Sequence, residues 1–362
     1  MDYTASGVQH RVTVDVLDRV SRATLGQLPG VSGFSIEKNL YNEYRCGGSI
    51  DVDLQTPVAW RKSLIRIWLT LELGGEVERH PLITGLPTVA GDTQTDTVLT
   101  LQAVLKDTTA FLDDTLGSTR AYPSGTVVTT ALKEIFTELG IAEAYVEPSA
   151  GTLRSDASWP PEATYRKLVN EMSATLGYAA VWSDSMGVLY VQPYQDPSER
   201  AEVFQLGWGE RSVTLPLVSR EYPDEMPNHF VLYTGDENPL IAEGWNTDPA
   251  SPYSTVNQRV VPYPGGQVDA TDQASLDRQL AVVMAQNRDG AHTYELSHRW
   301  FPLDPTRVIE LQSAGRLRTP EYRWRGVAVK EPLDVKVSVV QQSFSWSKGE
   351  PVSPVSTRLR GA

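Results

Sequence analysis

Alternating apolar and polar residues dominate the first hundred positions and predict β-strands. Residues 64–73 alternate over ten positions and place five apolar side chains on one face. Residues 49–54 and 97–105 alternate in the same way. A Gly-Gly pair at 74–75 supplies a tight turn, after which residues 77–85 return the chain. Several strands at this spacing predict a small antiparallel barrel or sandwich.

A helical period of apolar residues begins after residue 107. The first predicted helix covers residues 128–139 and is closed by Gly140. The second covers residues 165–176, where Gly177 adopts the left-handed conformation of a C-cap without a Cβ penalty. A hairpin over residues 179–192 follows. The apolar faces of the two helices consist of Val128, Leu132, Ile135, Phe136 and Leu139, and of Tyr165, Leu168, Val169, Met172 and Leu176.

Strand patterns return after residue 204, with one further helix. That helix is predicted over residues 272–288, with Thr271 as its N-cap and the Asp-Gly pair at 289–290 as its end. The last residues, 347–362, are polar and contain Pro, so we expect a loosely held tail. The predicted strands lie within residues 213–217, 229–235, 256–263, 292–300, 307–312, 322–332 and 335–346.

Length and composition indicate a folded protein of several domains. A chain of 362 residues is too long for one simple core and suggests two to four domains. Hydrophobic content of 40% with 24 Pro and 27 Gly fits a strand-rich and loop-rich protein. No run approaches the roughly 20 apolar residues that span a bilayer, and the N-terminus lacks the apolar segment of a secretory signal. We therefore expect neither a membrane span nor a signal peptide.

The net charge of −13 argues against a surface that grips nucleic acid, which needs clustered Lys and Arg. The charge is unevenly distributed. Residues 221–289 hold eleven acidic and three basic side chains, whereas residues 316–360 hold nine basic and four acidic ones. Either these segments are ordinary solvated surface, or they form complementary faces between neighbouring subunits of a ring.

The cysteine and histidine residues do not suggest a reactive or metal-binding site. Cys46 is the single cysteine, so we expect a small buried residue near a strand start. His292 and His298 would share a face of one strand, but about 20 Å apart, which is too far for one metal ion. The sequence therefore predicts no metal and no cofactor.

Carboxylate pairs occur at 113–114, 224–225 and 236–237, each in a turn-like context where Asp and Glu are ordinary. Sequence neighbours seldom supply two carboxylates placed across a substrate. No nucleophile elbow, P-loop or dinucleotide-binding glycine motif is present. We therefore expect no catalytic residues and no enzymatic activity.

The aromatic residues permit two interpretations. They could form a sugar-binding face or anchor subunit contacts, and two of them, Trp324 and Trp346, lie in alternating strands where a core or interface position is favoured. Residues 322–326 (YRWRG) alternate aromatic and basic side chains, a pattern that could touch nucleic acid, but the overall acidity disfavours this. The tryptophans considered are Trp208, Trp245, Trp300, Trp324 and Trp346.

One stretch carries a resemblance to a known family. A helix ending in LGY at 176–178 is followed by a strand, a short turn with Gly and a strand closing on PY at 193–194. QDPSER at 195–200, MPNHFVLYTG at 226–235 and TDPASPYS at 247–254 follow in order. This arrangement resembles phage tail-hub proteins, which include the baseplate hubs of contractile tails, the late control D proteins and the hub-type minor tail proteins of long-tailed actinobacteriophages.

The resemblance implies an α+β, mainly β fold with two tube-type antiparallel β-barrel domains and an α/β insert, like a phage baseplate hub. Residues 1–107 would form the N-terminal barrel and residues 108–200 the insert of two helices and a hairpin. Residues 201–346 would form the second barrel, with one helix and a peripheral insertion. Residues 347–362 would form the flexible C-terminal tail.

The resemblance also implies a function. The chain would be a structural hub, or minor tail protein, at the tail tip of a siphophage virion that assembles in the host cytoplasm. Three copies would form a ring that joins the tail tube to the tip and lets DNA pass during genome ejection without specific binding. Its partners would be the distal tail protein, the tape-measure protein and further tip or fibre proteins. The alternative is a receptor- or carbohydrate-binding tail module.

Overall fold

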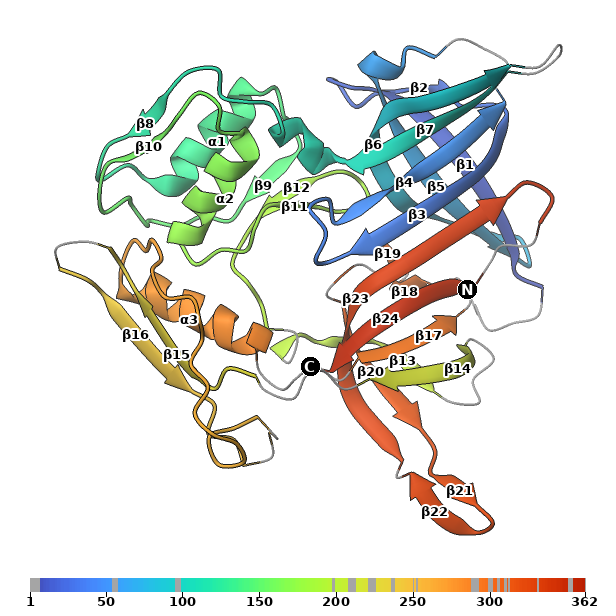
Figure 1. The fold of residues 1–362 in the computed structure, drawn as a ribbon. Coiled ribbons are helices and arrows are strands. Elements are labelled where there is room, and N and C mark those ends of the chain that lie inside the picture. Colours follow the sequence, from blue (N-terminus) through green and yellow to red (C-terminus); the bar gives the residue numbers. More distant parts are fainter. Residues whose placement is uncertain are drawn as a thin grey trace.

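The computed structural model shows a mainly β protein with an α/β insert, which confirms the predicted fold class (Figure 1). The structure describes residues 7–53, 58–94, 99–196, 199–207, 213–220, 226–235, 238–249, 251, 253–287, 293–298, 302–304, 307–308, 311, 313–330, 332–350 and 354–361.

The first β region contains the alternating strands predicted from the sequence. In β5, the buried residues Leu64, Ile65, Ile67, Leu69 and Leu71 show the expected apolar alternation from position 65 onward. The elements of this region are β1 (Gln9–Asp18), β2 (Thr24–Gln27), β3 (Val31–Asn39), β4 (Cys46–Asp53), η1 (Trp60–Lys62), β5 (Ser63–Leu73), β6 (Glu76–Gln94) and β7 (Leu99–Asp107).

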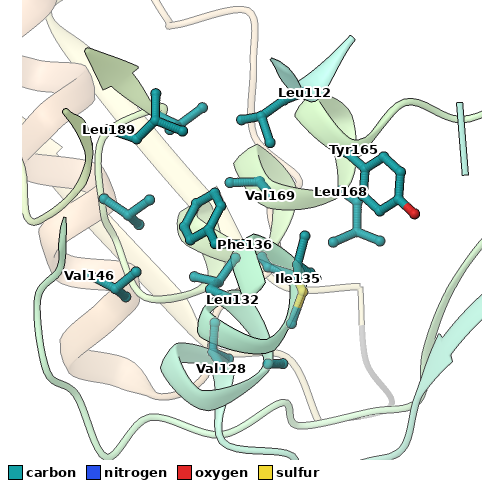
Figure 2. Close-up of a cluster of buried hydrophobic side chains, with 14 of the residues drawn as sticks. Leu112, Val128, Leu132, Ile135, Phe136, Val146, Tyr165, Leu168, Val169 and Leu189 are labelled. Carbon is teal, nitrogen blue, oxygen red and sulfur yellow. The ribbon is translucent and has the colours of Figure 1, made fainter. Parts of the chain in front are cut away.

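The insert follows β7 and contains both predicted helices. Figure 2 shows side chains of the two helices, together with those of β9 and β12, converging on one apolar core. The hairpin predicted over 179–192 forms as β11 paired with β12, and β12 also pairs in parallel with β9. The elements are η2 (Thr108–Leu112), β8 (Arg120–Tyr122), α1 (Val128–Glu138), β9 (Ala144–Val146), β10 (Ala157–Trp159), α2 (Tyr165–Thr175), β11 (Trp182–Ser183) and β12 (Leu189–Val191).

The C-terminal half contains a second β region and a separate α3 lobe, here residues 226–287. The lobe consists of β15 (His229–Tyr233), β16 (Ile241–Trp245) and α3 (Gln273–Asn287). The elements of the second β region are β13 (Glu202–Gly207), β14 (Val213–Arg220), β17 (Thr293–His298), β18 (Pro302–Asp304), β19 (Arg307–Val308), β20 (Ala314–Thr319), β21 (Tyr322–Trp324), β22 (Val327–Lys330), β23 (Leu333–Ser347) and β24 (Val355–Gly361).

One large sheet runs through both β regions. Its strands follow the order β14-β17-β24-β23-β3-β4-β7-β6-β5-β1-β2, with β20 and β13 branching from β23. All of its pairings are antiparallel except that of β13 with β20. Among the described residues this path ends at β2 and at β14, so the pairings do not close either β region into a barrel.

Strand β23 joins the two β regions. Its residues 333–338 pair with β20 of the second region, and its residues 341–347 pair with β3 of the first. Both partners lie on the same edge, because β24 occupies the opposite edge along residues 337–343. A single strand therefore supplies hydrogen bonds to both halves of the sheet.

A β-bulge in β23 keeps its apolar side chains on one face of the sheet. The register with β24 shifts between Val339 and Gln341, which inserts Val340 as an extra residue. Before the bulge the odd-numbered residue Val337 lies in the second core, and after it the even-numbered Phe344 lies in the first. Without this extra residue, the alternation of side chains along β23 would point either Val337 or Phe344 to the opposite face of the sheet, away from its core.

A buried polar layer separates the two cores where β3, β23 and β24 lie side by side. Gln342 is paired in register with Lys38 on β3 and with Thr357 on β24. These three residues and His298 are at most 2% exposed. His298 Nε2 lies 2.8 Å from the Thr357 hydroxyl. This contact links β17 to β24, whereas both polar atoms of the Gln342 amide are buried without a hydrogen-bond partner.

The C-terminal residues correct the predicted flexible tail. Residues 355–361 form β24, which pairs with β17 on one side and β23 on the other. Val355 lies in the first core and Leu359 in the second, both at most 1% exposed. The prediction was wrong because the sequence shows Pro and polar residues, whereas the alternation of buried residues at 355, 357 and 359 places the strand in the sheet.

Two further predictions differ from the structure. Residues 256–263 were expected to form a strand, but the chain there makes turns and an isolated bridge to His229. The N-cap of α3 is Asp272, whose side chain accepts a hydrogen bond from Ser275 N at 2.7 Å, and not Thr271. The Thr271 backbone N–H instead donates to Thr175 O at 3.0 Å. Helix α3 therefore contacts the insert, although the sequence placed it with the second barrel.

The turn of the insert hairpin docks on the first β region. Lys38, which is 1% exposed, donates to Ser185 Oγ at 2.7 Å. Two carbonyls of the turn also accept hydrogen bonds from the β region, namely Ser185 O from Thr84 at 2.9 Å and Met186 O from Arg66 at 2.8 Å. These contacts tie the insert to β3, β5 and β6, while Gly187 O accepts from Thr108 of η2 at 3.0 Å within the insert.

Helix α3 caps the C-terminal end of α2. Arg278 donates to Leu176 O at 2.9 and 3.2 Å, and Gln279 donates to Ala174 O at 2.7 Å. The Ala174 carbonyl also accepts the backbone N–H of Gly177 at 2.8 Å, so the last carbonyls of α2 are satisfied both by its own C-cap and by side chains from another helix. Gly177 has a φ of +70° and confirms the predicted C-cap. A Cβ there would lie 2.9 Å from the Arg278 Cβ, so the glycine also permits the close approach of α3.

Two substitutions separate these roles of glycine. Gly140 ends α1 at a φ of +67°, but a Cβ there would meet no atom within 4 Å. We expect Gly140→Ala to lower the free energy of unfolding by about 1 kcal/mol, the left-handed backbone penalty alone. Gly177→Ala should cost about 2–3 kcal/mol, because α3 must also move. Urea unfolding measures both, and equal losses would show that the α2–α3 contact does not constrain position 177.

Candidate functional site

The described residues contain no group of three or more His, Cys, Asp or Glu side chains placed to hold one metal ion. His298 is buried against Thr357, and His292 lies outside the described residues. His80 is also buried, and desolvation lowers its pKa although Glu78 lies 3.3 Å away. Cys46 is buried at the start of β4, in the place that the sequence predicts for it.

The acidic pair at 113–114 belongs to an ion network between the first β region and the insert. Asp113 accepts hydrogen bonds from the Tyr44 hydroxyl and from Arg166, whose Nη2 lies at 2.5 Å. Lys106 donates to the Tyr44 hydroxyl at 2.9 Å, and this bond raises the pKa of Lys106. Burial raises the pKa of Tyr44. The network joins the β3–β4 loop, β7 and α2, so Asp113 has a structural role; the other two pairs lie outside the described residues.

A second buried group lies beside this network. Asp107 accepts hydrogen bonds from Cys46 N at 3.0 Å and from Thr109 N at 2.9 Å, while burial raises its pKa. Burial lowers the pKa of Arg45 to about 10, with the charge of Asp107 acting in the opposite direction. The groups in both clusters bond to one another across a domain junction. This arrangement is suited to fixing the insert in place, and it contains no nucleophile paired with a base.

A pocket of about 250 Å³ lies between the insert and the α3 lobe. Trp159, whose indole N–H donates to Glu171 at 2.5 Å, lines its insert side. Thr234 and Thr271 line the side of the lobe. Its charged lining residues are Arg154 and Asp156 from the loop before β10, Glu171 on α2 and Asp269 of the lobe. The pocket lies along the same α2–α3 junction, and the Glu171 carboxylate is engaged by the Trp159 indole.

The tryptophans occupy different environments. Trp346 is partly buried in the first core and stacks on Phe34 with ring centroids 6.0 Å apart, as a core position predicts. Trp245 on β16 is 41% exposed. Trp208 and Trp300 lie outside the described residues, and Trp324 lies on β21. The sequence patterns did not single out Trp245 from the others.

The outer face of the β15–β16 sheet is an exposed aromatic surface. The inner residues Phe230, Leu232 and Ala242 pack with α3, so the alternate positions face solvent. This surface, here the β16 face, consists of His229, Val231 and Tyr233 on β15 and of Ile241, Glu243 and Trp245 on β16.

Glu243 orders the centre of the β16 face. His229 and Trp245 stack with centroids 3.6 Å apart and planes 10° apart. The carboxylate of Glu243 lies 2.9 Å from His229 Nε2 and accepts a hydrogen bond from Trp245 Nε1 at 3.1 Å. Since both rings are fixed before any partner arrives, a partner would lose little side-chain entropy by binding here.

The β21–β22 hairpin projects from the opposite side of the chain. In Figure 1 it extends away from the second β region, on the flank opposite to β15 and β16. Its strands pair with each other and with no other described strand. Arg325 and Gly326 form its turn, both with positive φ. Arg323 and Arg325 are exposed, and Arg323 forms an ion pair with Glu321 at 2.7 Å.

Ion pairs within the chain neutralise part of the basic segment 316–360. Arg316 pairs with Asp334 at 2.5 Å and with Glu202 at 2.9 Å, and Arg358 pairs with Glu295 at 2.7 Å. These arginines are therefore less available to a neighbouring subunit than the sequence suggests. Arg323 and Arg325 of the hairpin are also exposed, and Arg323 pairs with Glu321.

The structure is similar to solved tail proteins over nearly its whole length. A tail protein from Neisseria meningitidis MC58 matches with a TM-score of 0.64 at 12% identity, covering 97% of this chain and 96% of that chain. The 43 kDa tail protein of prophage MuSo2 from Shewanella oneidensis matches with a TM-score of 0.57 at 12% identity, covering 97% and 98%. The prophage tail protein gp18 from Listeria monocytogenes EGD-e matches with a TM-score of 0.51 at 11% identity, covering 96% and 94%.

Sequence comparison adds no closer relationship. No protein-family model matches the sequence. No curated protein matches it either. Among the described residues, no helix combines the length and the apolar character needed to cross a membrane. At these low identities the structural likeness establishes the fold, which this chain shares with these three tail proteins, two of them from prophages.

Proposed function

We propose that the chain is a structural hub of a phage tail tip, a minor tail protein that connects the tail tube to the tip or fibre proteins. The observation that carries this proposal is the match to three separate tail proteins, which covers at least 94% of each chain. The likeness therefore extends over nearly the whole chain and is not confined to one β motif. The protein would reside at the tail tip of the virion after assembly in the host cytoplasm.

The fold supports a trimeric ring. Each chain contains two β regions that share β23 and β24, so their relative orientation is fixed within one subunit. Three such subunits would present six β regions and adapt a sixfold tube to a threefold tip. The distal tail protein would lie on one side, and the tape-measure protein and further tip or fibre proteins would contact the other parts.

The proposed role needs no catalytic step. The polar clusters of the described residues join parts of the chain to one another, as the Asp113 and Asp107 networks do. The net charge of −13 suits a conduit for DNA, because a wall of cationic side chains would retain the phosphates. Screening limits the reach of such charges to about 8–10 Å at physiological salt.

Subunit counting tests the ring. We expect three copies per tail tip, because two β regions per chain then match six subunits of a tube. The measurement is single-particle electron cryomicroscopy of purified tails that carry a tagged copy of this protein, combined with its abundance relative to the tube protein. One copy or six copies per tip would contradict the proposal.

Duplex DNA tests the conduit. We expect the purified protein to show no salt-sensitive binding of duplex DNA between about 50 and 200 mM salt, since tight phosphate contacts would produce a steep salt dependence. Fluorescence anisotropy with a labelled duplex measures this, and a basic DNA-binding domain serves as the positive control. Tight binding that weakens about a thousandfold over this range would contradict passage without retention.

A further inference from the structure

Exposed apolar side chains on the β16 face indicate that a partner covers it. Ile241 is 60% exposed, Tyr233 43% and Trp245 41%, and they alternate along two paired strands. Aromatic side chains held in one rotamer are typical centres of protein interfaces. A stable partner would therefore cover the His229–Trp245 stack and leave the rim polar.

The charge of this surface selects a cationic partner. Glu243 is the carboxylate at the centre of the β16 face, and the described residues of the α3 lobe hold five acidic and two basic side chains. An arginine fits this chemistry, since its guanidinium can stack on an aromatic ring and donate to a carboxylate at the same time.

The β21–β22 hairpin offers that chemistry. Arg323 lies on β21 and Arg325 in the turn, and Ala328 on β22 is an exposed small residue of the same hairpin. The ion pair between Arg323 and Glu321 is on the surface, where such pairs contribute only about 0–1 kcal/mol and exchange readily. The hairpin and the β16 face lie on opposite flanks in Figure 1, so the hairpin of one chain does not cover the β16 face of the same chain.

We propose that the β21–β22 hairpin of one subunit docks on the β16 face of the next subunit. This contact rests on the proposed ring, because two different surfaces on opposite flanks make a heterologous contact that closes into a ring when the rotation permits. Arg323 and Arg325 would face Glu243, and Trp245 would be covered. The contact places a specific interface outside the large sheet.

Disulfide trapping between two variants tests the contact. One variant carries Ile241→Cys and the other Ala328→Cys, so that a mixed disulfide can form only between two copies. We expect the mixed dimer to form at least tenfold faster than in a control mixture of Val77→Cys with Ala328→Cys. Val77 is matched in exposure, at 62% against 60% for Ile241, but lies on β6 in the first β region.

Charge reversal tests the chemistry of the same contact. Arg323→Glu with Arg325→Glu in the Ala328→Cys chain should lower the trapping rate about tenfold. Glu243→Lys in the Ile241→Cys chain should restore it, because opposite charges again meet. If the arginine variants lower the trapping rate and Glu243→Lys does not restore it, then Arg323 and Arg325 do not face Glu243.

Native mass spectrometry of the same samples separates this inference from the ring itself. A trimer with no excess trapping over the control would overturn the hairpin contact and leave the hub proposal intact. If no trimer forms and trapping does not exceed the control, the result would contradict both the hub proposal and the hairpin contact. Saturable binding of an oligosaccharide that Trp245→Ala abolishes would also overturn the inference, since the face would then serve a carbohydrate.

Discussion

The rest of the structure depends on one strand that is shared between two β regions. β23 pairs with β20 over its first half and with β3 over its second, while β24 runs along the other edge. The bulge at Val340 keeps buried residues of both halves on one face. A chain with two separate barrels could vary their relative orientation through a linker. Here hydrogen bonds of a continuous sheet fix that orientation, which the proposed ring would require.

The insert and the α3 lobe are held by polar contacts and not by sheet pairing. The hairpin turn at residues 185–187 accepts hydrogen bonds from the first β region, and Asp113 joins the insert to Tyr44 and Arg166. Arg278 and Gln279 then tie α3 to the end of α2. Because polar contacts are directional, they set the position of these outer parts, and thereby the position of the β16 face, relative to the sheet.

The sequence predicted the elements better than their connections. The alternation in β5, the apolar faces of α1 and α2 and the C-cap at Gly177 follow from local patterns, and the structure confirms them. The tail prediction failed because a strand such as β24 is stabilised by its two neighbours, carries Ser and Arg between its buried positions and has Thr at one of them. The β16 face was not predicted, since alternation does not say which side of a two-stranded sheet a helix will cover.

Hydrogen exchange tests the shared strand most directly. Val339 is fully buried in the second core, so Val339→Ala should lower the free energy of unfolding by about 2 kcal/mol. If β23 couples the two cores, amides of β5 in the first core and of β17 in the second should both lose protection, by about thirtyfold. Loss of protection in β17 with unchanged protection in β5 would contradict the account, because the two β regions would then unfold independently.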